Sequence, residues 1–564
     1  MDNRPKRTAR EAMTALPSVL TQATFTNIAT EAIQAERSLG QVLLDVCRRR
    51  ADQVALSSLG RDFSYGELAD QSACLAAYLR HHLKLPVGSR VALMLPNLLN
   101  FPITMLAVIR ADLVLVPVNP LYTARELAHQ LKDAGAEVLI VLEQFAEVVA
   151  AALPGTAVTQ VIVCAVGDLM PWPKSMLMNL VVRHVKKQVP PYRLPNAVRW
   201  AEAIRIGRSL PVPDSHAKAC DTMQLQYTGG TTGLSKGATL SHNALLANAA
   251  GLEQWMGPLL QAGRVSLIAL PVYHIAAYSN LLIILLHGVR GVLLPNARDL
   301  PALVAAYARY RPDVFAGVNT LFDAILNNAQ FQQCDHSNLK LSIQGGTALR
   351  RATAERWRAL TGCRISEMYG LSETSAGITG NRWDADNPTG SIGLTLPGIE
   401  ASIRNEAGEV LPVGEVGELC VRGAALFTDY WQHPDETAKA HFDDGWFRTG
   451  DIGRQDAAGY LYILDRRKDM ILVSGFNVFP NEIEDVVALH PGVLEAAAVA
   501  VPDDKTGEAI KLVVVRRDPA LDEDSIRAHC RAQLTGYKQP KSIEFRDSLP
   551  KSAVGKVLRR ELRA

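Results

Sequence analysis

The sequence lacks any closely spaced pair of cysteines, although it contains eight cysteines in 564 residues. They are scattered along the chain without a C-x-x-C pattern, at positions 47, 74, 164, 220, 334, 363, 420 and 530. This scatter argues against a disulfide framework and against a cysteine-bound zinc site. Unpaired, dispersed cysteines are typical of a reducing compartment, so we expect a cytoplasmic protein.

Long hydrophobic runs are also missing. The longest apolar run, residues 281–286, is far shorter than the roughly 20 residues that a transmembrane helix needs. The N-terminus is basic, but no uninterrupted apolar stretch follows it, and Pro17 lies where such a stretch would be. We therefore expect neither a signal peptide nor a membrane-spanning helix.

Charge of one sign is not in excess either. The chain has 59 Lys and Arg residues against 57 Asp and Glu residues, which gives a net charge of +2. This balance offers no global attraction to a polyanion, so nucleic acid is not expected as a partner. Hydrophobic residues make up 48% of the chain, which is ample for a core. The length exceeds that of a single typical domain, so two or more domains are expected.

Short apolar strands alternate with helices from about residue 41 onward. The strand-like runs are residues 91–95, 113–118, 138–142 and 159–163. Short buried strands separated by helices indicate parallel sheets that are covered on both faces, which predicts an α/β fold. Residues 1–40 are polar and poorly patterned, and we expect them to form a loosely docked leader.

The pattern changes near Asn387. Short strands with Gly-Glu turns predict a small antiparallel β subdomain over about residues 387–464. Beyond Lys468 the chain alternates again, with strands at 495–501 and 511–515, a helix around 525–534 and a strand near Ile543. This is enough for a small separate domain. We therefore expect a large N-terminal domain over residues 41–467 and a C-terminal domain over residues 468–564.

A glycine-rich loop separates a strand-like run, residues 223–227, from a helix that begins after Ser241; residues 225–237 read LQYTGGTTGLSKG. Backbone N–H groups of such a loop can form a nest for phosphate oxygens, and hydroxyl groups and a lysine add further donors. The loop is not a Walker A motif, because that motif ends in Gly-Lys-Ser/Thr and this one ends in Ser-Lys-Gly. We expect a phosphate-binding loop of another kind, formed by Thr228, Gly229, Gly230, Thr231, Thr232, Gly233 and Lys236.

Three further strands are predicted to end in glycine and polar residues. They are residues 271–275 (PVYHI), 341–347 (LSIQGGT) and 365–374 (ISEMYGLSET). In open α/β sheets, ligands lie beyond the carboxyl ends of the strands, so these ends predict a binding site. The side chains and glycines concerned are His274, Gly345, Gly346, Thr347, Tyr369, Gly370 and Glu373.

One segment between these units is both basic and apolar. Between Met176 and Val189 the chain reads MLMNLVVRHVKKQV, with Leu177, Val181 and Val185 four residues apart. A basic amphipathic helix of this kind can lie on an anionic membrane surface, here on the cytoplasmic side. The alternative is a surface helix whose apolar stripe faces the protein core, and both stay open.

Five motifs, in their order along the chain, resemble the adenylate-forming superfamily, which includes acyl-CoA synthetases, firefly luciferase and the adenylation domains of peptide synthetases. They are residues 227–237, 369–374 (YGLSET), 449–451 (TGD), 465–468 (DRRK) and 550–556 (PKSAVGK). The resemblance covers nearly the whole chain after the leader. Further stretches are more similar still to bacterial long-chain fatty-acid–CoA ligases, namely residues 119–127 (NPLYTAREL), 469–478 (DMILVSGFNV) and 534–538 (LTGYK).

The resemblance implies a reaction in two steps, with ATP, Mg²⁺, CoA and a fatty acid. The carboxylate attacks the α-phosphate of ATP to give an acyl-adenylate and pyrophosphate, and CoA then displaces AMP. Lys556 matches the adenylation lysine, and Thr228 and Glu373 match the Mg²⁺ ligands, which are hard oxygen donors. Besides the loop residues named above, the implied nucleotide site comprises Gly345, Gly346, Thr347, Tyr369 on the adenine, Gly370, Thr374, Asp451 on the ribose, and Arg466.

For the second step, the resemblance implies that a small, mobile α+β C-terminal domain rotates about a hinge that matches Lys468. The rotation removes Lys556 and brings residues 474–476 to the CoA tunnel, while His274 lies near the acyl carboxylate. The implied residues of the acyl and CoA tunnels are Tyr273, Tyr278, Met368, Ser474, Gly475 and Phe476. The large domain is implied to hold two α/β sheets and a small β-barrel subdomain.

Other functions remain as alternatives. The chain could be an acyl-adenylate ligase that passes its product to a carrier protein, a medium-chain acyl-CoA ligase, or a non-enzymatic nucleotide- or lipid-binding protein. Retention of Lys556, Glu373 and Asp451 argues against a mere binder. Met368 replaces a glycine of the family motif, so we expect a narrowed acyl site that favours shorter or slimmer acids. A homodimer also stays open.

Overall fold

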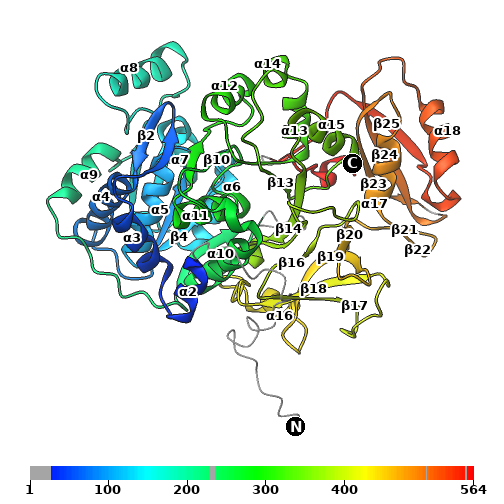
Figure 1. The fold of residues 1–564 in the computed structure, drawn as a ribbon, viewed down its shortest axis with the longest axis horizontal. Helices are drawn as coiled ribbons and strands as arrows, with labels where there is room; N and C mark the ends of the chain where they lie inside the picture. Colours follow the sequence, from blue (N-terminus) through cyan, green and yellow to red (C-terminus); the bar gives the residue numbers. More distant parts are fainter. Residues whose placement is uncertain (1–26, 229–234, 504, 553–554, 564) are drawn as a thin grey trace, which may run out of the picture.

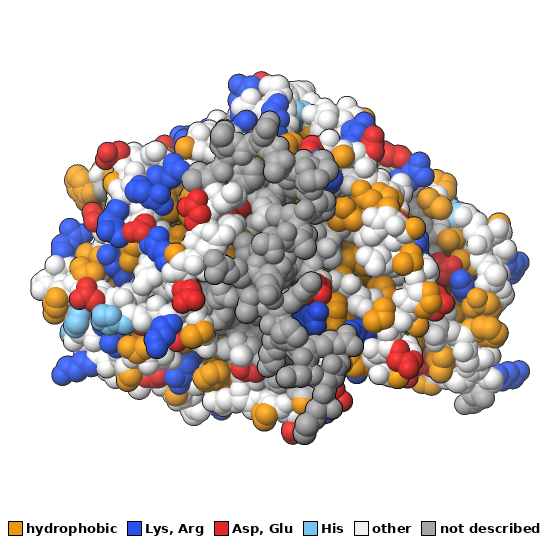
Figure 2. All heavy atoms as spheres, turned by 60° about the horizontal axis from the view of Figure 1, so that its bottom comes forward, with side chains coloured by type: hydrophobic (Ala, Val, Ile, Leu, Met, Phe, Trp, Pro, Cys, Tyr) orange, Lys and Arg blue, Asp and Glu red, His pale blue; other side chains and the backbone are white. Residues whose placement is uncertain are grey.

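The computed structural model describes residues 27–228, 235–503, 505–552 and 555–563. Figure 1 shows a large α/β body (blue to green), a small β unit below it (yellow) and a C-terminal unit at the right (orange to red). No helix among the described residues is long and apolar enough to cross a membrane. On the described part of the face in Figure 2, acidic and basic side chains are interspersed.

The first sheet of the body has seven strands in the order β7-β6-β5-β3-β4-β8-β9. Its neighbours are parallel except for β8 and β9, which are antiparallel and flank the glycine-rich loop. The strands are β3 (Arg90–Met94), β4 (Val114–Pro117), β5 (Val138–Leu142), β6 (Gln160–Cys164), β7 (Val198–Arg199), β8 (Thr222–Tyr227) and β9 (Gly237–Ser241).

The second sheet has nine strands in the order β16-β15-β14-β13-β12-β10-β11-β1-β2. It is parallel from β14 to β1 and has antiparallel strands at both ends. The strands are β1 (Val54–Ser58), β2 (Arg61–Ser64), β10 (Val265–Ile268), β11 (Arg290–Leu293), β12 (Val314–Gly317), β13 (Leu341–Gly345), β14 (Ile365–Leu371), β15 (Ala376–Gly380) and β16 (Leu394–Thr395).

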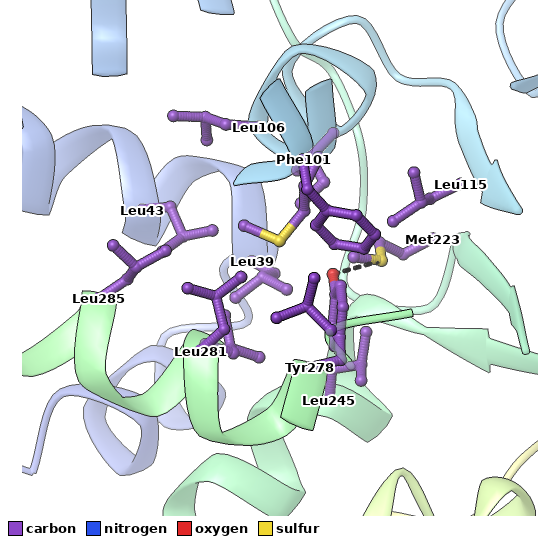
Figure 3. Close-up of a cluster of buried hydrophobic side chains, with 14 of the residues drawn as sticks. Leu39, Leu43, Phe101, Leu106, Leu115, Met223, Leu245, Tyr278, Leu281 and Leu285 are labelled. Carbon is purple, nitrogen blue, oxygen red and sulfur yellow. Dashed lines mark hydrogen bonds between the residues drawn. The ribbon is translucent and has the colours of Figure 1, made fainter. Parts of the chain in front are cut away.

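Helices cover both sheets on both faces, as the sequence pattern predicted. Helices α3, α5, α10 and α11 lie between the two sheets and share one core with them, to which Phe101 and Leu281 both belong (Figure 3). Helices α6 and α7 cover the other face of the seven-stranded sheet, and α12, α13 and α15 that of the nine-stranded sheet. The helices of the body are α3 (Leu39–Arg49), α4 (Tyr65–Ala77), α5 (Asn100–Arg110), α6 (Ala124–Ala134), α7 (Ala146–Ala152), α8 (Lys174–Leu180), α9 (Trp200–Arg208), α10 (His242–Met256), α11 (Ile275–His287), α12 (Leu300–Tyr310), α13 (Asn319–Leu326), α14 (Ala329–Gln332) and α15 (Arg351–Thr361).

The prediction of a loosely docked leader is wrong for residues 27–40. Residues 27–40 contain helix α2 (Ile28–Gln34) and the start of α3, and α2 buries Ile28 and Ala29 against the body. The N–H groups of Ala29 and Thr30 donate to the carboxylate of Glu253 on α10, at 2.6 and 3.2 Å. A buried carboxylate therefore satisfies the free amides at the start of α2 and fixes the helix to the core. Residues 1–26 lie outside the described part.

The β subdomain is an antiparallel sheet in the order β17-β18-β19-β20. Its strands are β17 (Ile399–Arg404), β18 (Gly417–Gly423), β19 (Phe447–Gln455) and β20 (Leu461–Arg466), and α16 (Pro434–Lys439) lies between β18 and β19 in the chain. Among the described residues, β17 and β20 do not pair with each other. The antiparallel prediction is confirmed, but the sheet is open rather than a closed barrel.

The C-terminal unit has its own sheet and its own hydrophobic cluster, which includes Ile471, Ile483 and Leu512. Three of its strands and one helix match the strands and the helix predicted beyond Lys468. The elements are β21 (Ile471–Val473), β22 (Phe476–Val478), α17 (Pro480–Ala488), β23 (Val493–Asp503), β24 (Gly507–Arg516), α18 (Glu523–Gln533) and β25 (Ser542–Arg546).

Candidate active site

Tyr369 and Asp451 join the nine-stranded sheet to the β subdomain. The phenol of Tyr369 on β14 donates to Oδ2 of Asp451 on β19, at 2.5 Å. Burial raises the pKa of Tyr369 well above its ordinary value, so the phenol stays protonated and can donate. Arg466, opposite Asp451 on β20, places its Nε 2.8 Å from Oδ1. Three predicted nucleotide-site residues from three strands are thus in direct contact.

The charges of this cluster also act on Lys556 of the C-terminal unit. Burial, and next the positive charge of Arg466, lower the pKa of Lys556 to about 8, while Asp451 opposes the shift. The turn that carries Lys556 touches the body, because a Cβ at Gly555 would lie 2.9 Å from Oγ1 of Thr320. Lys468 also belongs to this cluster of charges, and burial and Arg466 lower its pKa to about 8.

Arg559, which the sequence did not single out, holds this arrangement of the C-terminal unit. Its guanidinium bonds the Glu484 carboxylate at 2.9 Å and lies 3.5 Å from Asp465 at the end of β20. Asp465 also accepts a hydrogen bond from the N–H of Asn481, at 2.8 Å. Arg559 follows Lys556 by three positions, but no sequence pattern indicates which carboxylates it contacts.

The described residues at the two ends of the glycine-rich loop are hydrogen-bonded to each other. The N–H of Thr228 donates to the carbonyl of Lys236 at 2.9 Å, just beyond the β8–β9 pair. His129 of α6 lies with Nε2 3.0 Å from the carbonyl oxygen of Ser235. The predicted loop residues Gly229, Gly230, Thr231, Thr232 and Gly233 lie outside the described residues.

Glu373 lies in a single 3₁₀ turn, Ser372–Thr374, directly after β14. Its Oε1 accepts a hydrogen bond from Tyr430 at 2.7 Å, and burial raises its pKa above the ordinary value. A carboxylate and a threonine hydroxyl, such as those of Glu373 and Thr228, are oxygen ligands that suit Mg²⁺, which commonly takes one or two carboxylates and completes its shell with phosphate and water. These residues therefore fit the predicted metal.

The hydroxyl of Thr374 is bonded within its own turn. Its hydroxyl is fully buried and donates to the carbonyl oxygens of Leu371 and Ala376, the latter at 2.7 Å. Gly370 is required here, because a Cβ on it would lie 1.8 Å from the oxygen of Ala376. Thr374 and Gly370 thus shape the turn that presents Glu373.

Gly345 is the last residue of β13, beside β14, and Gly346 and Thr347 follow it. Gly345 pairs with Met368, and a Cβ at Gly345 would lie 3.0 Å from the Met368 carbonyl oxygen. Gly346 has φ +81°, a conformation that favours glycine. The Oγ1 of Thr347 accepts a hydrogen bond from Gln344 at 3.0 Å. The prediction that these residues lie at a strand end is confirmed.

His274 is not at the end of a strand, which corrects the prediction for residues 271–275. Strand β10 ends at Ile268, the segment 271–274 forms a turn, and His274 is the residue before α11. Pro271 has no amide hydrogen to donate in a sheet. The N–H of His274 donates to the carbonyl oxygen of Pro271 at 3.0 Å, within the turn. Burial lowers the pKa of His274 to about 4, so the imidazole is neutral.

The predicted acyl-site residues Tyr273, Tyr278 and Met368 have different surroundings. The carbonyl of Tyr273 accepts from Gln226 at 3.2 Å, next to the base of the glycine-rich loop. Tyr278 is fully buried in the central core, where its hydroxyl lies 3.9 Å from Sδ of Met223 (Figure 3). Met368 lies over β15, because a Cβ at Gly377 would come within 2.9 Å of its Cε.

The residues predicted for the CoA tunnel lie apart from Lys556. Ser474 and Gly475 form a two-residue turn with φ +50° and +83° between β21 and β22. Phe476 is 55% exposed and stacks on Tyr537 with the ring centroids 4.7 Å apart. The structure therefore leaves this loop in solvent, whereas Lys556 lies within range of the charges of Arg466 and Asp451.

Comparison with known proteins agrees with this geometry. The AMP-binding enzyme family matches residues 43–431, and the AMP-binding enzyme C-terminal domain matches residues 482–556. The chain belongs to the AMP-binding enzyme family. The first match covers most of the body and the second covers most of the C-terminal unit, so membership rests on both parts of this AMP-binding enzyme.

Several relatives and solved structures are similar over almost the whole chain. A long-chain-fatty-acid–CoA ligase of Escherichia coli O6:H1 is 47% identical over 91% of this chain and 92% of its own. A protein of the same name from Bacillus subtilis is 34% identical, over 93% and 94%. ATP-bound MatB from Rhodopseudomonas palustris has a TM-score of 0.77 at 29% identity, over 93% and 98%. A benzoate CoA ligase from Burkholderia xenovorans has a TM-score of 0.80 at 26% identity, over 93% and 100%.

Proposed function

We propose that this AMP-binding enzyme is an ATP-dependent long-chain fatty acid–CoA ligase. It joins a fatty acid to AMP with release of pyrophosphate, and it then transfers the acyl group to CoA with release of AMP. The observation that carries the proposal is the cluster of Tyr369, Asp451 and Arg466, with Lys556 of the C-terminal unit within range of its charges. Family membership and the names of relatives that are 47% and 34% identical support it.

In the first step, an acyl carboxylate must approach the α-phosphate, and both groups are negative. Lys556 supplies a positive charge where negative charge concentrates in the transition state. Lys236 and the loop hydroxyls hold the β- and γ-phosphates, and Thr228 and Glu373 would hold Mg²⁺, which would supply further positive charge to the phosphates. Asp451 accepts from the ribose hydroxyls with Arg466 beside it. His274, uncharged, lies beside the acyl carboxylate without adding a positive charge to that site.

In the second step, the C-terminal domain rotates about Lys468. The exposed positions of Phe476 and its turn support this step, because these residues cannot line a tunnel where they now lie. Pyrophosphate leaves before the thiol arrives, so one site serves both reactions in turn. Arg559 and Glu484 both belong to the C-terminal unit, so this ion pair can move as one body during the rotation. The contact of Arg559 with Asp465 on β20 must then separate.

Product analysis tests this function directly. The enzyme is supplied with MgATP and palmitate, with and without CoA, and pyrophosphate, AMP and acyl-CoA are measured. We expect release of pyrophosphate in both cases. Acyl-CoA and AMP should form in equal amounts, and only when CoA is present. Acyl transfer to an acyl carrier protein but not to CoA would support the carrier-protein alternative. A panel of acids from C4 to C18 separates long-chain from medium-chain specificity.

We also propose that the segment around α8 touches a membrane. Helix α8 and the turn after it project from the body at the top left of Figure 1. The apolar side chains of this segment do not face the protein core as a group. Within α8 and the turn after it, only Val182 is buried. Five apolar side chains here are 49–81% exposed, namely Trp172, Met176, Leu177, Leu180 and Val185. Lys174, Lys186 and Lys187 flank them. Apolar side chains beside lysines suit an anionic bilayer surface.

Vesicle sedimentation tests the membrane contact. Wild-type enzyme should bind phosphatidylglycerol-containing vesicles more strongly than phosphatidylcholine vesicles, because of the lysines. Replacing both Leu177 and Leu180 by Ser should weaken binding, and the double change Val410→Ser and Val413→Ser controls for exposed apolar residues elsewhere. Equal binding by both double variants would exclude α8 as the contact.

A further inference from the structure

A segment from the β subdomain side, residues 427–431, extends the seven-stranded sheet beside the glycine-rich loop. It runs antiparallel to β9, with a bridge between Ala238 and Tyr430. The N–H of Trp431 donates to the carbonyl of Gly237 at 2.8 Å. Because Gly237 directly follows Lys236, this pairing fixes Tyr430 next to the end of the loop.

The side chain of Tyr430 contacts two residues of the proposed ATP site. Its hydroxyl donates to Oε1 of Glu373 at 2.7 Å, and the Nζ of Lys236 lies 5.1 Å from its ring centroid. Burial raises the pKa of Tyr430, so the phenol remains a donor. One aromatic residue therefore connects the proposed metal ligand to the proposed phosphate-binding lysine.

Glu436, in α16, is the present partner of that lysine. Its carboxylate forms an ion pair with Lys236 and a second one with Lys439, the latter at 2.9 Å. These two lysines, Lys236 first, hold the pKa of Glu436 at about 2, so it is charged at neutral pH. Both Lys236 and Glu436 are partly exposed, and an exposed pair of this kind is weak enough to be exchanged.

We propose that Tyr430 and Glu436 are positioning residues of the nucleotide site: Tyr430 fixes Glu373 for Mg²⁺, and Glu436 holds Lys236 until triphosphate oxygens replace it. The proposal rests on the proposed function, because it takes Glu373 and Lys236 as ligands of MgATP. A hydrogen bond to one carboxylate oxygen orients the other, which is how neighbours of metal ligands tune a site. The negative charge of Glu436 also opposes an arriving triphosphate until Lys236 changes partner.

Tyr430→Phe tests the first role, because it keeps the ring and removes only the hydroxyl. We expect the half-saturating Mg²⁺ concentration for pyrophosphate release to rise about tenfold, while KM for the fatty acid stays unchanged. A general loss of structure would not raise the Mg²⁺ requirement while leaving KM for the fatty acid unchanged.

The matched control is Tyr462→Phe, which removes a phenol that donates to Asp456 at 3.0 Å in the same β subdomain. It should leave the Mg²⁺ requirement unchanged. A wild-type Mg²⁺ requirement in Tyr430→Phe overturns the role of Tyr430. Melting temperatures of the two variants show whether each is folded.

Glu436→Gln tests the second role and changes a surface ion pair, so folding should not depend on it. We expect KM for MgATP to fall about two- to fivefold, because Lys236 is no longer held by a carboxylate. Glu400→Gln is the matched control, since Glu400 pairs with Arg422 at 2.8 Å elsewhere in the subdomain. A higher or unchanged KM in Glu436→Gln overturns the exchange of partners.

Binding measurements separate this proposal from the proposed function. Calorimetric titration with MgATP needs no turnover and is done on wild type and both variants. Wild-type protein that binds MgATP but releases no pyrophosphate with any fatty acid refutes the ligase function alone. Unaltered Mg²⁺-dependent ATP binding in Tyr430→Phe refutes the positioning role alone.

Discussion

Arg466 places its Nε 2.8 Å from Oδ1 of Asp451, and the two residues face each other across β19 and β20. Strand β20 ends at Arg466, and Lys468 follows two positions later. The proposed ribose site and the proposed hinge are therefore parts of one strand and its continuation. Occupation of the nucleotide site and the orientation of the C-terminal domain can affect each other through this short link.

Lys556→Ala should reduce acyl-adenylate formation about 10²–10³-fold, because it removes a preorganised positive donor at the developing charge. Thioester formation from preformed acyl-adenylate should remain largely intact. Single-turnover assays of the two half-reactions measure this. Lys551→Ala, in the same turn and paired with Glu495, is the control for folding of the turn. An equal loss in both half-reactions contradicts the two-conformation mechanism.

Lys468→Pro should show the opposite pattern. Proline fixes φ and hinders the backbone change that the rotation requires. Adenylation should persist while CoA transfer falls steeply, again measured by separate half-reactions. Lys468→Ala keeps the backbone free and should retain CoA transfer. Unchanged kinetics in the proline variant would place the hinge elsewhere.

The adenylation rate should decline at alkaline pH from about 8, because Lys556 must be protonated and its pKa is lowered to about 8. The limb should appear in kcat/KM, which reports the free enzyme. Lys556→Arg should remove this limb, since an arginine does not lose its proton in this range. The pKa of Lys468 is also lowered to about 8, so Lys468→Ala serves as the control. The alkaline decline must persist in Lys468→Ala if it is to be assigned to Lys556.

Met368→Gly should raise kcat/KM for a C16 acid relative to a C8 acid by about tenfold. Overfilling a confined site costs roughly 1–3 kcal/mol, and methionine is flexible enough to place the effect in the lower half of that range. The Cε of Met368 now lies over Gly377 on β15. Steady-state kinetics with both acids decide the matter, and an unchanged ratio means that the side chain does not line the acyl tunnel.

Glu253→Ala should lower the free energy of unfolding by about 3 kcal/mol, the scale of leaving buried hydrogen-bond donors without their acceptor. It leaves His287, whose Nε2 lies 2.8 Å from Glu253, and the amides of α2 without their acceptor. Denaturant unfolding measures the loss. Limited proteolysis should also cut earlier near residues 28–34. Thr30→Ala, which removes only a 3.3 Å hydroxyl contact, should cost far less.

The sequence alone predicted the elements whose signal is local. The alternation of short apolar runs and helices predicted parallel sheets covered on both faces, and the order of five motifs predicted the family. Residues 271–275 show the limit, because an apolar run of this length suits a strand or a turn leading into a helix equally well. The proline in that run, Pro271, was the local sign that favoured the turn.

Only the tertiary structure decided which distant residues meet. Tyr430 lies far along the chain from both Lys236 and Glu373, and no spacing or periodicity connects them; the antiparallel pairing of its segment with β9 does. In the same way, Glu253 fixes α2, and Arg559 selects Glu484, through folding of the whole chain. Motifs specify chemistry through nearby residues, whereas charge pairs form between side chains that only packing brings within a few ångströms.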